Sequence, residues 1–283
     1  LQTYFSYANT TGRGILNENK LSKHNINLRE TAVLFNSRLK LDGNVNVMKQ
    51  TVKNKPVSGG FYMNPLVGLY RFPRGEDLSY YKENYERYDE DRKLNTQNWH
   101  TFTEAFEQNP YWIQNRIQSK DARIRLLLSL SANLKVTDWL TLQARGNLDH
   151  SADKLRQKFY ASTATALCGM NGRYIEMDYQ ETQMYGDVMA MVKKQLNDFT
   201  LDVAIGGSIN DRITNSTRID SKNASLKYAN VFNLANIVMS SSASIDQKID
   251  AHYQLQSVFA TAQIGYKEGV FLDLTARNDW SST

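Results

Sequence analysis

The stretch that decides the fold runs from residue 124 to residue 136 and reads Ile124-Arg125-Leu126-Leu127-Leu128-Ser129-Leu130-Ser131-Ala132-Asn133-Leu134-Lys135-Val136. Every even position in it is apolar, and every odd position except Leu127 is polar. An alternation with a period of two places the two kinds of side chain on opposite faces of a β-strand. The stretch therefore predicts a long strand with one apolar and one polar face.

The same alternation recurs along the chain, and helical periodicity of comparable length does not. We expect nine strands, over residues 2–9, 24–35, 38–50, 122–136, 139–153, 173–195, 199–217, 249–267 and 270–283. Turn-forming residues separate neighbouring stripes at Asn36-Ser37, Thr137-Asp138, Asn197-Asp198 and Glu268-Gly269. Longer polar connections cover roughly residues 10–23, 51–121, 154–172 and 218–248. Short and long connections alternate, which predicts an antiparallel meander with all short turns at one end.

Composition alone suggests a water-soluble globular protein, since 41% of the 283 residues are hydrophobic and the mean hydropathy is −0.54. The longest apolar run, 188–192, is far shorter than the roughly 20 residues of a membrane-spanning helix. The length of the predicted strands argues against a water-soluble protein. Soluble strands usually have about 5–6 residues, whereas strands that cross a bilayer need about 9–11. The predicted strands 122–136 and 139–153 fit the second class, so we expect an all-β, antiparallel transmembrane barrel rather than a soluble sandwich.

In such a barrel the apolar face contacts lipid and the polar face lines a wet lumen. Phe199 and Tyr266 fall on the apolar face, as interface aromatics should, whereas Trp139 falls on the polar one. Charged residues on the polar face are expected to face the lumen: Arg125, Lys135, Arg145, Asp149, Asp202, Asp273 and Arg277.

The connection 51–121 is expected to be a large, folded extracellular loop. All four prolines lie in it, and it is rich in tyrosine and tryptophan. Its aromatic side chains have two readings: they contact a sugar or a partner protein, or they form the loop's own small core. Gly68, Pro73 and Gly75 predict a turn that presents Tyr70 and Phe72. The candidate contact residues are Tyr62, Tyr70, Arg71, Phe72, Trp99, Tyr111 and Trp112.

Other chemistry finds little support in the sequence. The single cysteine, Cys168, excludes an internal disulfide. The four histidines are far apart, and there is no catalytic motif, so we expect no enzyme activity, no metal and no cofactor. The net charge of +5 is small, and the basic residues are scattered along the chain rather than gathered in a patch, which argues against a nucleic-acid partner.

The ends of the chain suggest a segment of a longer protein. The chain begins with Leu1, and its last strand ends on Thr283 part-way through the alternation. Nine is also an odd number of strands, whereas single-chain bacterial barrels have an even number. We therefore expect residues 1–283 to be part of a barrel domain, without its plug domain and without the C-terminal part of the barrel.

Five motifs carry a resemblance to a known family. They are Lys23-His24-Asn25-Ile26-Asn27-Leu28-Arg29, Gly59-Gly60-Phe61-Tyr62-Met63-Asn64-Pro65, Asn109-Pro110-Tyr111-Trp112, Lys135-Val136-Thr137-Asp138-Trp139-Leu140 and Leu274-Thr275-Ala276-Arg277-Asn278-Asp279-Trp280-Ser281-Ser282-Thr283. Together they resemble the SusC/RagA family of TonB-linked (TonB-dependent) outer-membrane transporters.

The resemblance implies a 22-stranded barrel in the outer membrane of a Gram-negative bacterium. Members of this family import bulky nutrients, oligosaccharides or peptides. A SusD-like surface lipoprotein covers their extracellular loops, and TonB supplies energy through the N-terminal region, which this sequence lacks. The expected partners are thus a SusD-like lipoprotein, TonB, the substrate and outer-membrane lipid. The alternative is a secreted or surface β-rich module that binds carbohydrate with the aromatic loop.

Overall fold

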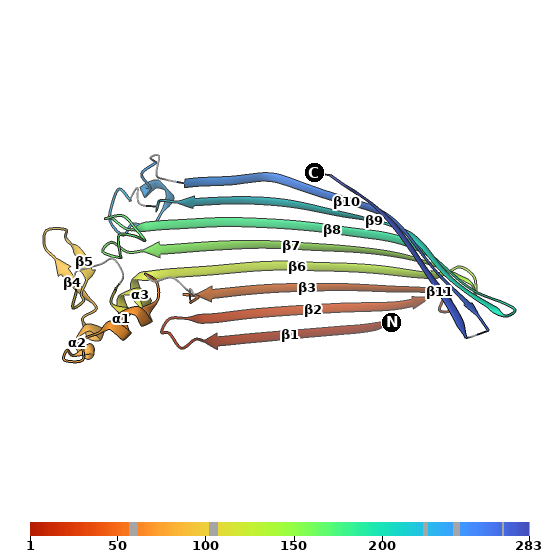
Figure 1. The fold of residues 1–283 in the computed structure, drawn as a ribbon, viewed down its shortest axis with the longest axis horizontal. Coiled ribbons are helices and arrows are strands. Elements are labelled where there is room, and N and C mark those ends of the chain that lie inside the picture. Colours follow the sequence, from red (N-terminus) through yellow and green to blue (C-terminus); the bar gives the residue numbers. More distant parts are fainter. Residues whose placement is uncertain (57–61, 102–106, 223–225, 240–243, 268, 283) are drawn as a thin grey trace.

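The computed structural model describes residues 1–56, 62–101, 107–222, 226–239, 244–267 and 269–282. Nine long strands form one antiparallel sheet in which neighbours in sequence are neighbours in space (Figure 1). They are β1 (Gln2–Arg13), β2 (Lys20–Leu34), β3 (Leu39–Lys53), β6 (Ile117–Lys135), β7 (Leu140–Phe159), β8 (Arg173–Leu196), β9 (Phe199–Asp220), β10 (Ser244–Tyr266) and β11 (Val270–Ser281). The sheet is twisted, so that β11 runs at an angle to the other strands in Figure 1.

All nine predicted strands are confirmed, but several extend further than the alternation suggested. The predicted long connection 10–23 is wrong, because β1 and β2 pair up to Arg13 and Lys20 and leave a short link. Residues 51–53 and 117–121 likewise belong to β3 and β6 rather than to the loop. In these extensions polar side chains replace the apolar stripe, as Lys20 does on β2 and Lys53 on β3. The backbone pairing continues where the apolar stripe has ended.

The short turns lie where they were predicted, at the right-hand end of Figure 1, here named the short-turn end. Asn36 and Asn197 have φ values of 54° and 52°. Asparagine tolerates this left-handed backbone better than most residues, which suits it to tight hairpins. The turn predicted at Glu268-Gly269 also joins two paired strands, although Glu268 itself lies outside the described residues.

The strand register separates two faces across the whole sheet. Leu128 lies opposite Val45 on β3 and Leu148 on β7, whereas Arg145 lies opposite Ser131 on β6 and Asp187 on β8. We name the face of Leu128 the apolar face and that of Arg145 the polar face. By register, all seven residues expected to line a lumen share the polar face.

The apolar face is uncovered in this structure. Large side chains from its middle are more than half exposed, including Leu130 at 62%, Val188 at 64% and Ile205 at 57%. The other sheet in the described residues is the small hairpin of β4 (Glu86–Asp89) and β5 (Leu94–Gln97). The described residues therefore contain no second layer of the kind that a soluble sandwich needs to bury such a face.

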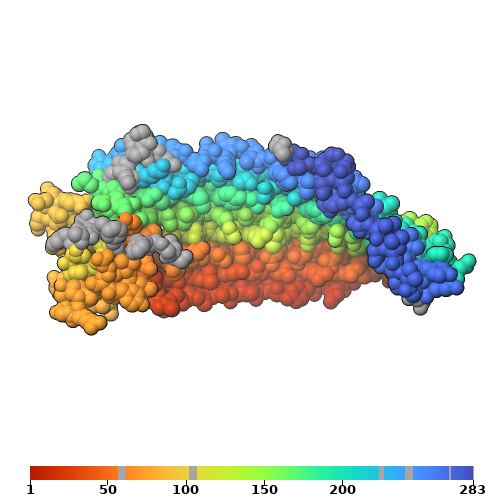
Figure 2. All heavy atoms as spheres, viewed as in Figure 1, coloured from red at the N-terminus to blue at the C-terminus, as the bar shows by residue number. Residues whose placement is uncertain are grey.

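The buried core lies in the loops at the other end of the strands, here named the loop end. Three short helices, α1 (Pro65–Arg71), α2 (Leu78–Glu83) and α3 (Pro110–Arg116), gather there with the β4–β5 hairpin (Figures 1 and 2). One buried cluster joins Ile113 of α3 to Ile117, Phe159, Cys168 and Ile175. No helix in the described part of the chain is long and apolar enough to cross a membrane.

Candidate functional site

Two Asn-Pro pairs mark the starts of helices α1 and α3 in the large loop. The side chains of Asn64 and Asn109 accept hydrogen bonds from the backbone N–H groups of Leu66 and Tyr111, and each is followed by a proline in the first turn. An asparagine cap followed by proline satisfies one open N–H and fixes the backbone for a helix. The two pairs therefore start α1 and α3 at defined places.

The two helices pack closely at Gly68. A side chain there would collide with the carbonyl oxygen of Gln108 and approach the ring of Pro110. The Gln108 side chain donates to the carbonyl of Tyr62 at 2.5 Å and accepts from the backbone N–H of Ala164 at 2.8 Å. Gln108 thus ties the segment before α1 to the β7–β8 connection.

Aromatic rings form a small core between α1 and the segment after β5. The Phe72 ring lies 5.1 Å from that of Trp99, 5.7 Å from Tyr81 and 5.4 Å from His100, measured between centroids. The carboxylate of Glu107 accepts from Trp99 Nε1 at 3.2 Å and pairs with His100 Nε2 at 2.7 Å. Arg71 Nε lies 3.3 Å from the same carboxylate. These aromatic residues hold the loop in one shape.

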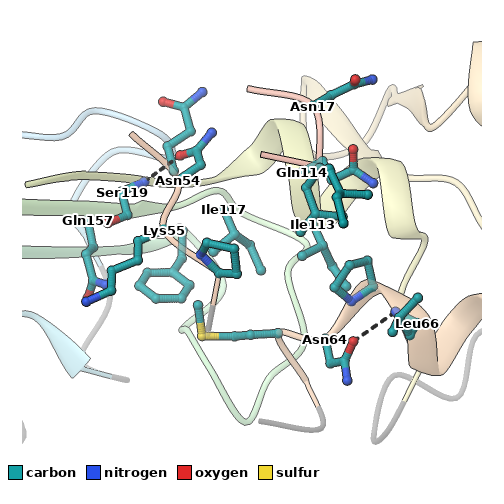
Figure 3. A pocket seen from close by; sticks show the side chains of 17 residues that line it. Asn17, Asn54, Lys55, Asn64, Leu66, Ile113, Gln114, Ile117, Ser119 and Gln157 are labelled. Atoms are coloured by element: carbon teal, nitrogen blue, oxygen red, sulfur yellow. Dashed lines mark hydrogen bonds between the residues drawn. The ribbon is translucent and has the colours of Figure 1, made fainter. Parts of the chain in front are cut away.

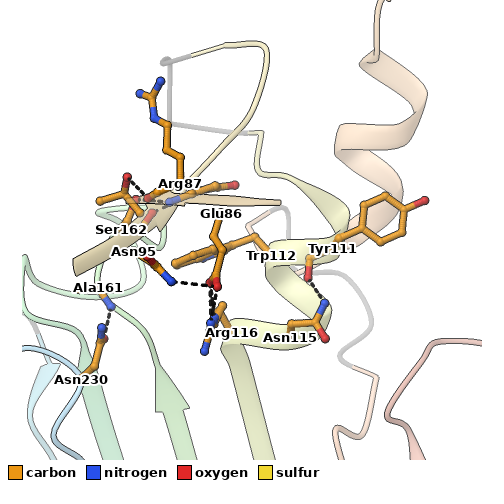
Figure 4. A network of polar contacts seen from close by, with 12 residues as sticks. Glu86, Arg87, Asn95, Tyr111, Trp112, Asn115, Arg116, Ala161, Ser162 and Asn230 are labelled. Atoms are coloured by element: carbon orange, nitrogen blue, oxygen red, sulfur yellow. Dashed lines mark hydrogen bonds and ion pairs between the residues drawn. The ribbon is translucent and has the colours of Figure 1, made fainter. Parts of the chain in front are cut away.

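Hydrogen bonds between loops extend this order across the loop end (Figure 4). Arg116 and Glu86 form a two-pronged ion pair that ties the β4–β5 hairpin to the start of β6. Trp112 Nε1 donates to Thr163 Oγ1 at 3.0 Å, and the backbone N–H of Ala161 donates to Asn230 Oδ1 at 2.7 Å. The three large connections therefore form one linked platform.

The predicted contact residues divide by exposure. Trp99 and Trp112 are buried, with 7% and 0% of their surface exposed, and serve the loop's own core. Phe72, Tyr62 and Tyr111 are half-buried. Tyr70 is 85% exposed on α1, next to the exposed Leu66 and Leu69. Of the predicted set, only Tyr70 and Arg71 are largely open to a partner.

A cavity of about 510 Å³ lies beside α1 and α3, on the polar-face side of β6 and β7 (Figure 3). Its apolar lining includes Met63, Pro65, Ile113, Ile117 and Phe159. Amide side chains surround this lining: Asn17, Asn54, Asn64, Gln114, Gln118 and Gln157. An apolar lining with a few polar groups is the usual form of a ligand site. None of the amide residues was predicted from the sequence, although the two Asn-Pro pairs signal the helices beside them.

The one cysteine of the chain lies in the buried cluster beside the cavity. Burial raises the pKa of the Cys168 thiol to about 11, so the thiol stays protonated and unreactive at neutral pH. The described residues contain no group of three or more histidine, cysteine and acidic side chains placed to hold a metal ion.

Opposite charges pair along the polar face below the platform. Arg145 Nε lies 3.0 Å from the fully buried carboxylate of Asp187, and Arg125 pairs with Asp149. Similar pairs join Lys193 to Asp202, Arg277 to Asp279 and Lys135 to Asp138, and Asp273 accepts from Gln263. Many charged residues of this face therefore have an oppositely charged neighbour.

Comparison with solved structures identifies the architecture. The RagAB peptide transporter matches with a TM-score of 0.69 and 15% identity, over 99% of this chain and 30% of the other. The ferric-catecholate import receptor Fiu of E. coli K12, in its open form, matches with a TM-score of 0.54 and 10% identity, over 98% and 40%. The siderophore receptor PiuA of Acinetobacter baumannii gives 0.51 and 10%, over 99% and 42%. The fold is that of an outer-membrane transporter barrel.

The predicted fold class, an incomplete antiparallel transmembrane barrel, is therefore confirmed. The fold shared with the RagAB transporter agrees with the sequence resemblance to the SusC/RagA family and with the predicted place in the outer membrane of a Gram-negative bacterium. No family model and no curated protein sequence matches the chain. The chain spans about a third of the length of the transporter structures it matches.

Proposed function

We propose that this chain forms part of an outer-membrane importer of bulky nutrients, which works with a SusD-like surface lipoprotein and draws energy through TonB. The observation that carries the proposal is the division of one large sheet into an uncovered apolar face and a polar face of paired charges. Such a sheet suits a wall between lipid and a water-filled passage. The role is passage of a substrate, and no bond chemistry is required of these residues.

Within this role, a peptide is the substrate class that the loop end favours over an oligosaccharide. Proteins that bind sugars commonly stack an exposed aromatic ring on the sugar, but Trp99 and Trp112 are buried here and the exposed Tyr70 does not line the cavity. The cavity beside α1 instead combines an apolar lining with amide side chains, which can pair with the N–H and C=O groups of a peptide. RagAB, whose fold this chain shares, is itself a peptide transporter. The same observations disfavour a secreted carbohydrate-binding module.

Uptake by the full-length parent protein tests this proposal. Cells that depend on it should take up a labelled oligopeptide, and a variant with both Gln114→Ala and Gln157→Ala should do so several-fold more slowly, because two rim amides of the cavity are lost. Gln195→Ala, which removes an amide at the short-turn end, is the matched control. Uptake of an oligosaccharide in place of the peptide would overturn the choice of substrate. If the cells took up neither compound, the proposal that the protein is an importer would be overturned.

The lid protein is proposed to dock on the exposed side of α1. Leu66, Leu69 and Tyr70 expose 46%, 37% and 85% of their surface there, while the buried Gly68 and Pro65 fix the helix from below. Exposed apolar and aromatic residues on a rigid support are typical of a protein interface. Tyr70→Ala should reduce recovery of the SusD-like lipoprotein with the parent protein, whereas Tyr4→Ala on β1 should not. Equal recovery with the wild type and both variants would rule out this docking site.

A further inference from the structure

A row of five basic residues crosses the sheet near the loop end. Arg13 lies directly opposite Lys20, Lys20 opposite Lys53, Lys53 opposite Lys120, and Lys120 opposite Arg156. The row runs over β1, β2, β3, β6 and β7, and its span is about 19 Å at the usual spacing of about 4.8 Å between strands. The prediction that basic residues are scattered is wrong here, because strand register gathers residues that are far apart in the chain. We name these five residues the basic row.

The basic row lies on the apolar face. Lys120 and Ile124 belong to the same face of β6, as do Lys53 and Val47 on β3. Ile124 lies four positions after Lys120, which corresponds to about 13 Å along the strand. For a strand tilted by about 40°, this is about 10 Å along the membrane normal. The row therefore lies just beyond the apolar band, at the height where lipid headgroups surround a barrel.

This arrangement is unfavourable in the protein alone. Like charges directly opposite each other destabilise neighbouring strands. Two members have acidic neighbours, since Lys20 pairs with Glu18 at 3.1 Å and Arg156 with Glu176 at 2.9 Å. Arg13, Lys53 and Lys120 form no ion pair with any residue that the structure describes. On the polar face, by contrast, Arg125 and Arg145 each form an ion pair with an aspartate.

The surface is hollowed between members of the row. One hollow, of about 660 Å³, is lined by Arg13, Lys20 and Lys53 together with the hydroxyl groups of Thr11, Ser22 and Thr51. A second, of about 560 Å³, is lined by Lys53, Lys120, Arg156 and Lys158 with the amides of Asn115 and Gln118, and the carboxylate of Glu18, which pairs with Lys20, also borders it. Lys53 borders both. Each hollow offers several cationic and hydrogen-bonding donors to one oxygen-rich anion.

We propose that the basic row binds the phosphate groups of phosphorylated lipid headgroups in the leaflet at the loop end. The inference rests on the proposed position of the sheet in the outer membrane. A lipid is favoured over a soluble anion because the row is continuous with the lipid-facing band and follows its edge over five strands. The bound phosphates would remove the repulsion between the opposed side chains and fix the height of the barrel in the membrane.

The test uses the full-length protein in phosphatidylcholine nanodiscs titrated with lipid A as the phosphorylated probe, and bound lipid is measured by native mass spectrometry. A variant with Lys53→Gln and Lys120→Gln should bind the probe about thirty-fold more weakly, because each basic residue near a charged surface contributes about five-fold. Lys194→Gln with Lys267→Gln removes the same charge at the short-turn end and should leave binding unchanged. Retained heat resistance of the barrel on gels verifies that both variants fold.

Equal binding by the wild type and the Lys53/Lys120 variant would overturn the inference, as would equal binding of an uncharged glycolipid. Displacement of the lipid by inorganic phosphate at comparable concentration would also overturn it, because the site would then be one for a free anion. The titration needs no substrate. A negative result in the titration would therefore not contradict the proposal of nutrient import. A negative uptake assay would likewise not contradict the proposal of lipid binding.

Discussion

The guanidinium group of Arg116 donates two hydrogen bonds to the carboxylate of Glu86, from Nε at 2.7 Å and from Nη2 at 2.8 Å. Arg116 ends α3 where the chain enters β6, and Glu86 begins the β4–β5 hairpin. Burial acts to lower the pKa of Arg116, but the hydrogen bonds and charge of Glu86 outweigh it, so the net pKa is raised. The pair therefore anchors the hairpin to the wall of the barrel.

Glu86→Gln should loosen the hairpin without unfolding the barrel. The substitution leaves the half-buried Arg116 without its counter-charge. We expect this to destabilise the folded hairpin locally by about 1–3 kcal/mol. Amide hydrogen exchange of residues 86–97 in the full-length protein should become faster. Asp198→Asn is the control, since it breaks an exposed pair with Lys267 that contributes about 0.5 kcal/mol or less. Unchanged exchange in the hairpin would mean that its other contacts suffice to hold it.

Trp112 and Tyr70 should respond in opposite ways to truncation, although both were predicted as contact residues. Trp112 is fully buried and donates to Thr163, so Trp112→Ala should cost about 3–5 kcal/mol of loop stability. Tyr70→Ala removes an exposed ring and should change stability by about 0.5 kcal/mol or less. Limited proteolysis of the loop in the full-length protein measures both. Similar protease resistance of the two variants would contradict this assignment of Trp112 to the core.

The sequence predicts the strands well because the membrane imposes a different solvent on each face. From Ile124 to Val136 every second residue is apolar, and all but one of the residues between them are polar. This alternation disappears beyond the apolar band, where the outer face meets lipid headgroups instead of acyl chains and carries polar residues, and for this reason the predicted strands stop short of Arg13, Lys20 and Lys53.

The loop end could be predicted only in part. Asn64-Pro65 and Asn109-Pro110 carry a local signal for helix starts, but each helix has seven residues, too few to show periodicity. Which aromatic residue is buried depends on contacts between connections, such as that of Trp112 with Thr163. The basic row could not be predicted from the sequence either, because members that are neighbours in the sheet lie up to 67 positions apart along the chain, as Lys53 and Lys120 do.

Cys168 should resist thiol reagents until the loops unfold. Its side chain is buried, and burial raises its pKa from 9.0 to about 11. The folded protein therefore holds the thiol proton more tightly than the unfolded chain. The resulting stabilisation is complete below pH 9 and is lost as the pH rises toward 11. Maleimide labelling of the full-length protein at neutral pH should be slow when folded and rapid in denaturant. Rapid labelling of the folded protein would show that the connection 160–172 opens readily.

Leu130 and Ser131 offer a direct test of which face meets lipid. They are adjacent on β6, and their side chains lie on the apolar and the polar face respectively. Leu130 is 62% exposed and lies near the middle of the apolar band, so Leu130→Arg should destabilise the inserted barrel by about 2–4 kcal/mol. Ser131→Arg adds the same side chain one residue away, toward the proposed lumen, and should cost far less. Urea unfolding of the full-length protein in phospholipid vesicles measures both. If the two variants lost equal stability, or if Ser131→Arg lost more, lipid would not lie against the apolar face.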